Sequence, residues 1–334
     1  MLPVDVVTSA LRDPDTVSAG IIEINLTEGF QETEKGVEPE DCVEIPSDVK
    51  LTPSTLRSRF PERRVVALDA SSLVLGYSEE GVVGVIRAAV VVKEPGVKAC
   101  RFERYGPFLI CFTHQNREVV YRKLQQHVFG VTPPSNAPRF DNIVDRIRNL
   151  LEKHLQLEIA RNYGDALILF DGALTSGTVD SPKSYLDKTL DAARNSGSDI
   201  ASVSKHSTLT LKSNEGILAP LKGFYGPCLC DVTPHIKGYY GKYQSIKVYG
   251  VKMTPLGEPF RVDIPISTPT THMVVLSEVS GLAGDYGYPE ELKLAHVSTV
   301  FSSVEALELQ ASAIKKYRLE LREDVRKKIF GPWG

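Results

Sequence analysis

The sequence predicts an α/β protein whose core is a mixed β-sheet flanked by helices. Two continuous apolar runs, Val65–Asp69 and Ala166–Asp171, lack polar alternation, which is typical of strands covered on both faces. Strand-like segments joined by short turns follow the first run, and a long helical pattern precedes the second. Each run ends in an aspartate, so we expect a carboxylate at the rim of the sheet on two of its strands.

Composition excludes several other classes of protein. With 334 residues, 42% hydrophobic and 24% charged, the chain is long enough for one large or two small globular domains. Five cysteines without regular spacing argue against a disulfide scaffold and for a reducing interior. The start lacks the pattern of a signal peptide, and the longest apolar run, Val82–Val92, is too short to span a bilayer and contains Arg87. We therefore expect a cytoplasmic protein without a membrane partner.

Residues 1–62 are interpreted as an N-terminal appendage to a main domain at 63–334. Residues 1–60 hold twelve acidic and five basic residues, a net charge of −7, although the whole chain carries only −3. Within the appendage, Ile21–Ile24 is a candidate strand. Thr52–Leu56 is predicted to begin a short helix, because Pro53 is tolerated in a first helical turn.

The first part of the main domain is predicted to be an antiparallel meander. Its strand-like segments are separated by short turns, which cannot form the long crossover that a parallel pair requires. These segments are Val65–Asp69, Leu73–Tyr77, Val82–Val92, Cys100–Phe102 and Phe108–Phe112.

Helical spacing follows the meander over Asn116–Phe129 and over Arg139–Tyr163, and the strand Ala166–Asp171 comes next. This order resembles the ribonuclease H-like fold, in which the first and fourth strands are parallel neighbours. Asp69 and Asp171 would then lie side by side.

The remainder alternates helices and strands. We expect a helix at Pro182–Asn195, a fifth strand ending in Lys205, a hairpin of Val248–Lys252 with Phe260–Ile264, and a helix that carries His296. A capping box at Ser302–Glu305 predicts a long C-terminal helix, whose charge run we interpret by default as a solvated face. Its basic residues are Lys315, Lys316, Arg318, Arg322, Arg326, Lys327 and Lys328.

Two neighbouring carboxylates repel each other unless a cation lies between them, so Asp69 and Asp171 predict a divalent-metal site. A helix needs about eleven residues to retrace a five-residue strand, since its rise is only about 1.5 Å per residue. Counting back from Tyr163 reaches Glu152, whose carboxylate could return to the same rim. Glu158 is the second candidate for this position.

Several short motifs, taken in their order along the chain, resemble the NurA family of nucleases, which process DNA ends in archaea. They are Leu68–Ser71, Leu169–Leu174, Val203–Lys205 and Gly287–Pro289, with His296 eight residues after Tyr288; Ala70 stands where the family usually has glycine. The resemblance implies a nuclease that acts on single- and double-stranded DNA ends. Its cofactor is expected to be manganese, with magnesium as the alternative. The resemblance further implies 5′–3′ exonuclease and single-strand endonuclease activities, a nucleoid-associated homodimer, and a hexameric HerA-like translocase as partner.

Two-metal hydrolysis of a phosphodiester needs carboxylates that hold the cations about 4 Å apart. We assign Asp69 and Asp171 to the metals and Glu152 to completing the ligand set. His296 is predicted to be a ligand or a general acid or base.

Two further residues are expected to handle the substrate. Tyr288 is predicted to orient the phosphate or the attacking water, and Lys205 is predicted to pair with the scissile phosphate.

Alternatives remain open for each residue and for the whole chain. Strand-end aspartates often cap turns, a helical glutamate is often solvated, and a lone histidine is often structural. The main alternative function is a catalytically inert ribonuclease H-like scaffold that binds DNA or the translocase. A phosphotransferase is less favoured, because its first aspartate normally lies in a parallel sheet.

Overall fold

The computed structural model describes residues 21–23, 44–45, 51–78, 80–130, 136–205, 210–211, 216, 218–236, 243–317 and 320–322. Within these ranges, no helix is both long and apolar enough to cross a membrane.

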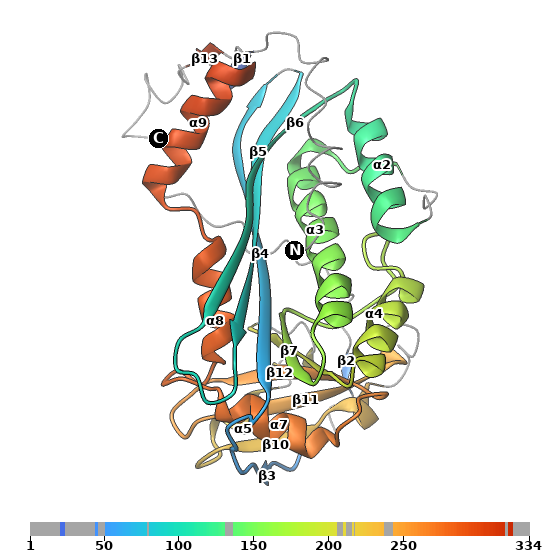
Figure 1. Ribbon diagram of the computed structural model, residues 1–334, viewed down its shortest axis with the longest axis vertical. Coiled ribbons are helices and arrows are strands. Elements are labelled where there is room, and N and C mark those ends of the chain that lie inside the picture. Colours follow the sequence, from blue (N-terminus) through green and yellow to red (C-terminus); the bar gives the residue numbers. More distant parts are fainter. Residues whose placement is uncertain are drawn as a thin grey trace.

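Five strands form the centre of the sheet in the order β6, β5, β4, β7, β8. β4 (Arg64–Ser78), β5 (Gly81–Lys93) and β6 (Arg101–Thr113) are antiparallel, as predicted, and appear in Figure 1 as a tall ribbon. The predicted division into five strands is wrong, because β4 unites the first two predicted segments and β6 unites the last two. β7 (Ala166–Asp171) runs parallel beside β4, and β8 (Asp199–Ser204) runs parallel beside β7. This is the ribonuclease H-like order, so the predicted fold class is confirmed.

The sheet continues beyond β8 through antiparallel strands. β12 (Pro259–Pro265) and β11 (Ile246–Lys252) form the predicted hairpin, and β10 (Cys228–Asp231) follows. The edge strand is β3 (Ser54–Thr55), so the helix predicted from Thr52 is wrong. Pairing with β10 satisfies backbone groups there that a single helical turn would leave open.

Four further strands in the described part of the chain are only two or three residues long. β1 (Ile21–Glu23) confirms the predicted N-terminal strand and pairs with the end of β4 and with β13 (Glu320–Arg322). β2 (Glu44–Ile45) pairs with β9 (Thr210–Leu211) in a separate small sheet. The domain boundary after residue 62 stays a prediction.

The helices cover both faces of the sheet, with α3 on one side of the long strands and α8 and α9 on the other (Figure 1). The expected helices are present at 117–129, 140–162 and 183–195; α7 was not predicted. Their bounds are α2 (Arg117–Phe129), α3 (Phe140–Asn162), α4 (Lys183–Asn195), α5 (Ala219–Lys222), a 3-10 helix (Thr233–His235), α7 (His272–Gly281), α8 (Glu290–Thr299) and α9 (Ser303–Tyr317).

Alternation along β4 decides which helix each side chain meets. Val66 and Leu68 pack in the same buried cluster as Ile143 of α3, whereas Ala67 packs with Leu292 of α8. Successive strand residues point to opposite faces, so Asp69 points to the face of α8.

The C-terminal helix begins as predicted but ends earlier than its charge run. Ser302 Oγ accepts a hydrogen bond from the backbone N–H of Glu305 at 3.2 Å, while the Glu305 carboxylate pairs with Arg87 instead of closing the capping box. The helix ends at Tyr317, so it carries Lys315 and Lys316, and Arg322 belongs to β13. Arg318 and Arg326–Lys328 lie outside the described residues.

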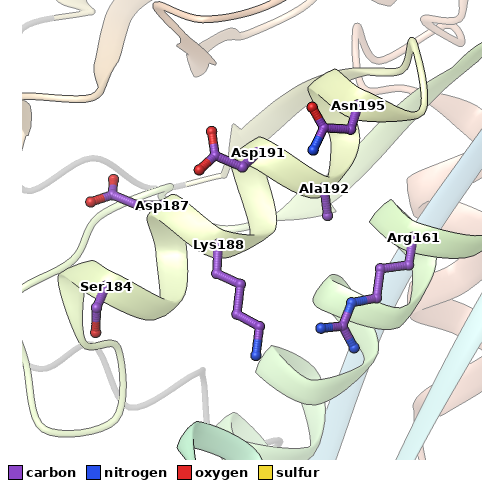
Figure 2. A pocket seen from close by; sticks show the side chains of 7 residues that line it. All are labelled: Arg161, Ser184, Asp187, Lys188, Asp191, Ala192 and Asn195. Atoms are coloured by element: carbon purple, nitrogen blue, oxygen red, sulfur yellow. The ribbon is translucent and has the colours of Figure 1, made fainter.

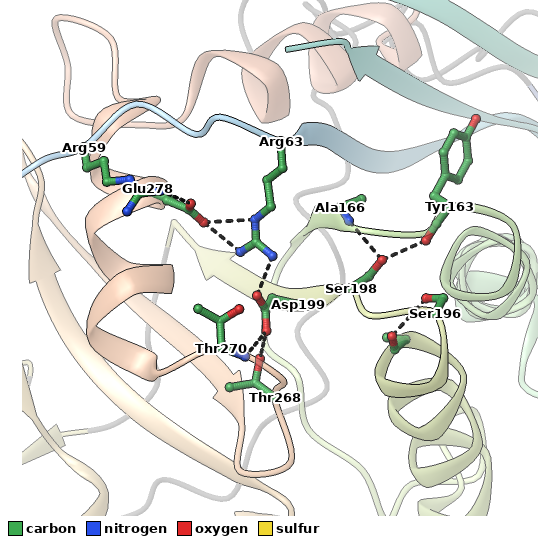
Figure 3. Close-up of polar contacts among 11 residues, drawn as sticks. Arg59, Arg63, Tyr163, Ala166, Ser196, Ser198, Asp199, Thr268, Thr270 and Glu278 are labelled. Atoms are coloured by element: carbon green, nitrogen blue, oxygen red, sulfur yellow. Dashed lines mark hydrogen bonds and ion pairs between the residues drawn. The ribbon is translucent and has the colours of Figure 1, made fainter.

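Arg63 ties the start of β4 to β8 and α7 (Figure 3). Its Nη1 lies 2.5 Å from Asp199 Oδ2, its Nη2 lies 2.7 Å from Glu278 Oε2, and its side chain is 13% exposed. Burial acts to raise the pKa of Asp199, but hydrogen bonds from Thr268, Thr270 and Arg63 outweigh it and hold this pKa below its usual value. One largely buried guanidinium thus bridges the two buried carboxylates and offsets part of their negative charge.

Candidate metal centre

Strands β4 and β7 place the two predicted aspartates beside each other. Their parallel register pairs Leu68 with Phe170, so Asp69 and Asp171 are level on neighbouring strands and point to the same face. Asp69 is 0% exposed and Asp171 is 7% exposed. β7 ends at Asp171, whereas β4 continues to Ser78. Asp171 therefore lies at the carboxyl end of its strand, as predicted, whereas the prediction that the first strand ends at Asp69 is wrong, because β4 continues for nine more residues.

Helix α8 brings His296 to these carboxylates. The Nδ1 atom of His296 lies 2.8 Å from Asp69 Oδ2. Thr299, one turn later, holds the helix in place, because its hydroxyl donates to the His296 carbonyl at 2.9 Å and lies 2.8 Å from the Ser71 hydroxyl. Leu292, one turn before His296 on the same face of the helix, is buried in the core.

Asp69, Asp171 and His296 offer ligand atoms that all lie within 4.8 Å of one another. Six ligands at about 2.1 Å from a cation lie roughly 3 Å apart when adjacent and roughly 4 Å apart when opposite. The spacing in this cluster is close to that range. Carboxylate oxygens suit Mg²⁺ and Mn²⁺, whereas the imidazole nitrogen favours a transition-metal ion such as Mn²⁺ over Mg²⁺. The residues present therefore fit a divalent cation.

Lys205 and Tyr288 lie directly beside the cluster. Lys205 Nζ is 3.1 Å from Asp171 Oδ2 and 5.3 Å from the centre of the Tyr288 ring. Its side chain is 36% exposed, so it also faces solvent. Burial raises the pKa of Tyr288 well above its usual value, and the charges of Asp171 and Asp69 raise it further. Tyr288 thus stays a neutral phenol that can donate a hydrogen bond.

The loop after Asp171 is supported by Asp263 and Arg261, which the sequence analysis did not single out. Gly172 has a φ of +100°, a conformation that favours glycine, and its N–H donates to Val203 at 3.0 Å. The N–H of Leu174 donates to Asp263 Oδ2 at 2.9 Å, and Arg261 Nε donates to Asp263 Oδ1 at 2.8 Å. The sequence did contain a signal for this ion pair, because Arg261 and Asp263 are two residues apart on a predicted strand and therefore point to the same face of the sheet.

Glu152 lies on the helix that covers the opposite face of the sheet. It is 8% exposed and accepts a hydrogen bond from Gln156 Nε2 at 3.3 Å. Among the described residues, it does not belong to the group of ligand atoms within 4.8 Å. Glu158 pairs with Arg161 at 3.0 Å near the end of α3. The role of either glutamate stays a prediction.

A separate groove lies between α3 and α4 (Figure 2). Arg161 of α3 and Lys188 of α4 point toward one another there, and Asp187 and Asp191 contribute the opposite charge. None of the residues that line it belongs to the cluster. We assign no function to this mixed-charge surface.

The strand order and the cluster of two aspartates and a histidine define a ribonuclease H-like α/β protein with a candidate metal centre. The sequence profile described as "NurA domain" matches residues 63–301, which is most of the chain and includes all of the predicted site residues. The chain therefore belongs to the NurA family of nucleases, and the predicted family is confirmed. A comparison with curated protein sequences gives no match.

The solved structures that match this chain in a structural comparison share little sequence with it. The NurA nuclease from Sulfolobus solfataricus is 13% identical with a TM-score of 0.47, and the alignment covers 85% of this chain and 89% of that one. A NurA structure described as bound to dAMP and manganese is 11% identical with a TM-score of 0.42, covering 79% and 90%. Endonuclease V from Streptomyces avermitilis is 12% identical with a TM-score of 0.36, covering 81% and 99%.

Proposed function

We propose that this chain is a metal-dependent nuclease that hydrolyses phosphodiester bonds of DNA. The observation that carries the proposal is the cluster of Asp69, Asp171 and His296, with ligand atoms within 4.8 Å of one another. Three residues from distant parts of the chain converge on one face of the sheet. Keeping two carboxylates adjacent and buried costs free energy through their mutual repulsion, which a bound cation would relieve.

Asp69, Asp171 and His296 would hold a divalent cation, with manganese or magnesium as the candidates. When bound, such an ion lowers the pKa of a coordinated water and polarises the phosphoryl oxygen. Glu152, which we expected to complete the ligands, stays a candidate further ligand, although it lies on α3, which covers the opposite face of the sheet from the cluster. Two-metal chemistry is part of the same proposal.

Lys205 and Tyr288 are the groups that would meet the substrate beside that ion. The partly exposed ammonium of Lys205 can exchange its contact with Asp171 for a phosphate oxygen, since both partners are anionic. Tyr288, kept protonated by its surroundings, can donate a hydrogen bond to a phosphate oxygen or to the attacking water. Both residues orient the reacting groups without changing their own charge.

The resemblance to the NurA family supports a finer proposal about substrate and partners. It favours single- and double-stranded DNA ends as substrates, with 5′–3′ exonuclease and single-strand endonuclease activities in end resection. A homodimer, association with the nucleoid and a hexameric HerA-like translocase as partner belong to the same proposal.

Degradation of end-labelled single- and double-stranded DNA tests the proposal, with manganese, magnesium or a chelator present. We expect metal-dependent cleavage by the native protein. Asp171→Asn should lower the rate by more than the roughly 10–100-fold that loss of a partner outside the ligand set typically causes. Lys183→Gln is a matched control, because Lys183 lies on α4 and hydrogen-bonds Gln244.

Two outcomes would contradict the proposal. Absence of cleavage by the folded native protein would favour the inert scaffold that binds DNA or the translocase. Equal cleavage by native protein and Asp171→Asn would point to a contaminating nuclease.

A further inference from the structure

Two tight turns pack against each other next to the cluster. The β11–β12 hairpin turns at 254–257, where the N–H of Gly257 donates to Thr254 at 3.3 Å. The segment before Tyr288 turns at 284–287, where the N–H of Gly287 donates to Gly284 at 2.8 Å. Both turns thus have four residues, a closing hydrogen bond and a glycine in the last position.

The two closing glycines bring the turns into backbone contact. A Cβ atom added to Gly257 would lie 2.9 Å from the Cα of Gly287 and 3.1 Å from the carbonyl oxygen of Tyr286. A Cβ added to Gly287, whose φ is +81°, would lie 3.2 Å from the Cα of Gly257. Only residues without a side chain allow this approach, so the paired turns hold each other in place.

Each turn presents a large apolar side chain at its third position. Leu256 is 96% exposed and Tyr286 is 80% exposed. Single exposed apolar residues are common on protein surfaces. Two of them on turns fixed in backbone contact form a small rigid platform, which we call the Leu256–Tyr286 platform.

The platform lies close to the candidate metal centre along the chain. Tyr286 precedes Tyr288 by two residues, so their Cα atoms are at most about 7.6 Å apart. Backbone hydrogen bonds fix this short connection, because the N–H of Gly284 donates to the Tyr288 carbonyl at 3.0 Å. Neighbouring nucleotides in one strand of B-DNA rise about 3.4 Å, so the platform is within a few nucleotides of a phosphate at the centre.

Charges around Tyr286 indicate which part of a nucleic acid it contacts. Lys293 Nζ lies 6.0 Å from the centre of the Tyr286 ring, but it also pairs with Glu290 at 3.5 Å. Asp285, beside Tyr286 in the same turn, is exposed. The carboxylates disfavour a phosphate here, whereas the aromatic face stays accessible to an uncharged base.

We propose that the Leu256–Tyr286 platform binds unpaired bases of a single-stranded DNA segment entering the site, with Tyr286 stacking on a base and Leu256 contacting its neighbour. The proposal rests on the proposed nuclease function. Stacking on aromatic side chains is sequence-tolerant, because every base has a π-face. The platform would therefore hold a strand near the centre without selecting its sequence.

Fluorescence of 2-aminopurine in a single-stranded oligonucleotide tests the stacking, since stacking on an aromatic ring quenches it. The full chain carrying Asp171→Asn serves as the parent that does not degrade the probe. Tyr286→Ala in that parent should raise the Kd at least about fivefold and abolish the quenching. Tyr286→Phe should keep both, and Val119→Ala, an exposed apolar site on α2, is the control. Unchanged Kd and quenching in Tyr286→Ala would overturn the proposal.

A second assay separates this proposal from the nuclease function. Hydrolysis of thymidine 5′-(p-nitrophenyl phosphate) with manganese is measured for the native protein and for Tyr286→Ala, without the Asp171 substitution. Equal rates are expected, because this substrate has no neighbouring base. If Tyr286→Ala loses hydrolysis while the native protein retains it, the 284–287 turn positions Tyr288, and the stacking role would be overturned. No hydrolysis by the native protein, with quenching that depends on Tyr286, would contradict the nuclease and support the platform.

Discussion

Two pairs of buried carboxylates lie at opposite ends of the parallel strands β7 and β8. Asp199 begins β8 and lies near Glu278, with Arg63 bonded to both. Asp171 ends β7 and lies near Asp69, where the partners described are the imidazole of His296 and the partly exposed ammonium of Lys205. The first pair has a guanidinium fixed inside the protein, and we interpret it as structural. The second pair has side chains that can exchange partners, and we interpret it as the metal centre.

Removal of Arg63 should give the largest effect on stability. Arg63→Met leaves Asp199 and Glu278 as buried charges without their guanidinium, so we expect the free energy of unfolding to fall by about 3–5 kcal/mol. Denaturant unfolding followed by circular dichroism measures this. Arg59→Met is the matched control, because Arg59 is 52% exposed and lies 3.7 Å from the same Glu278, so a change of at most about 1 kcal/mol is expected. Equal effects of the two substitutions would refute a structural role for the Arg63 pair.

Isosteric substitution of one aspartate in each pair sharpens the comparison. Asp199→Asn weakens hydrogen bonds to Arg63 and Thr270, so the free energy of unfolding should fall by about 1–3 kcal/mol. Without metal, Asp171→Asn removes one of two neighbouring like charges and should leave stability unchanged or raise it. Thermal unfolding in chelator compares the variants. Equal destabilisation by both would mean that the Asp171 cluster is structural as well.

Substitution of the glutamates on α3, Glu152 and Glu158, is expected to lower activity less than substitution of Asp171. Glu152→Gln should lower manganese-dependent cleavage by roughly 10–100-fold if Glu152 completes the site from α3. Glu158→Gln should change it by less than about twofold, because Glu158 already pairs with Arg161 and a surface pair contributes little. Rates on labelled DNA decide between them, and a larger loss in Glu158→Gln would reverse the assignment.

The smallest expected effect is a pH dependence from His272. Burial lowers the pKa of His272, whose Nδ1 lies 2.8 Å from the Tyr249 hydroxyl. Its folded pKa is below its unfolded value of about 6.5, so the unfolded state binds more protons and stability is lost as the pH falls below that value. Between pH 7.5 and 5.5, the native Tm should fall further than that of His272→Gln, by a small amount because His272 is only partly buried. A larger fall in the variant would contradict this sign.

Much of the central fold could be predicted because it depends on local pattern. Continuous apolar runs indicated β4 and β7, short turns indicated the antiparallel meander, and spacing of apolar residues indicated α3. The prediction that the two runs are parallel neighbours placed Asp69 and Asp171 side by side, although Asp69 lies within β4 and not at its end. The two-residue strand β3 could not be predicted, because its pairing with β10 joins residues far apart in sequence.

Other parts of the site depend on tertiary contacts that spacing does not encode. His296 meets Asp69 across 227 residues, and only the motif resemblance connected them beforehand. Counting residues along α3 estimates how far along the strands Glu152 lies, but it cannot indicate which face of the sheet the helix covers. Alternation along β4 shows that Asp69 points away from α3, and this requires knowledge of which helix covers which face.

Binding of manganese, followed by electron paramagnetic resonance, tests the central claim most directly. The signal of free aqueous Mn²⁺ is titrated with native protein, Asp171→Asn and Asp199→Asn, each shown to be folded by circular dichroism. The account predicts that native protein and Asp199→Asn deplete the free signal, whereas Asp171→Asn does so much less. Depletion by Asp171→Asn equal to that of the native protein, or no depletion by the native protein, would contradict a metal centre at Asp69, Asp171 and His296.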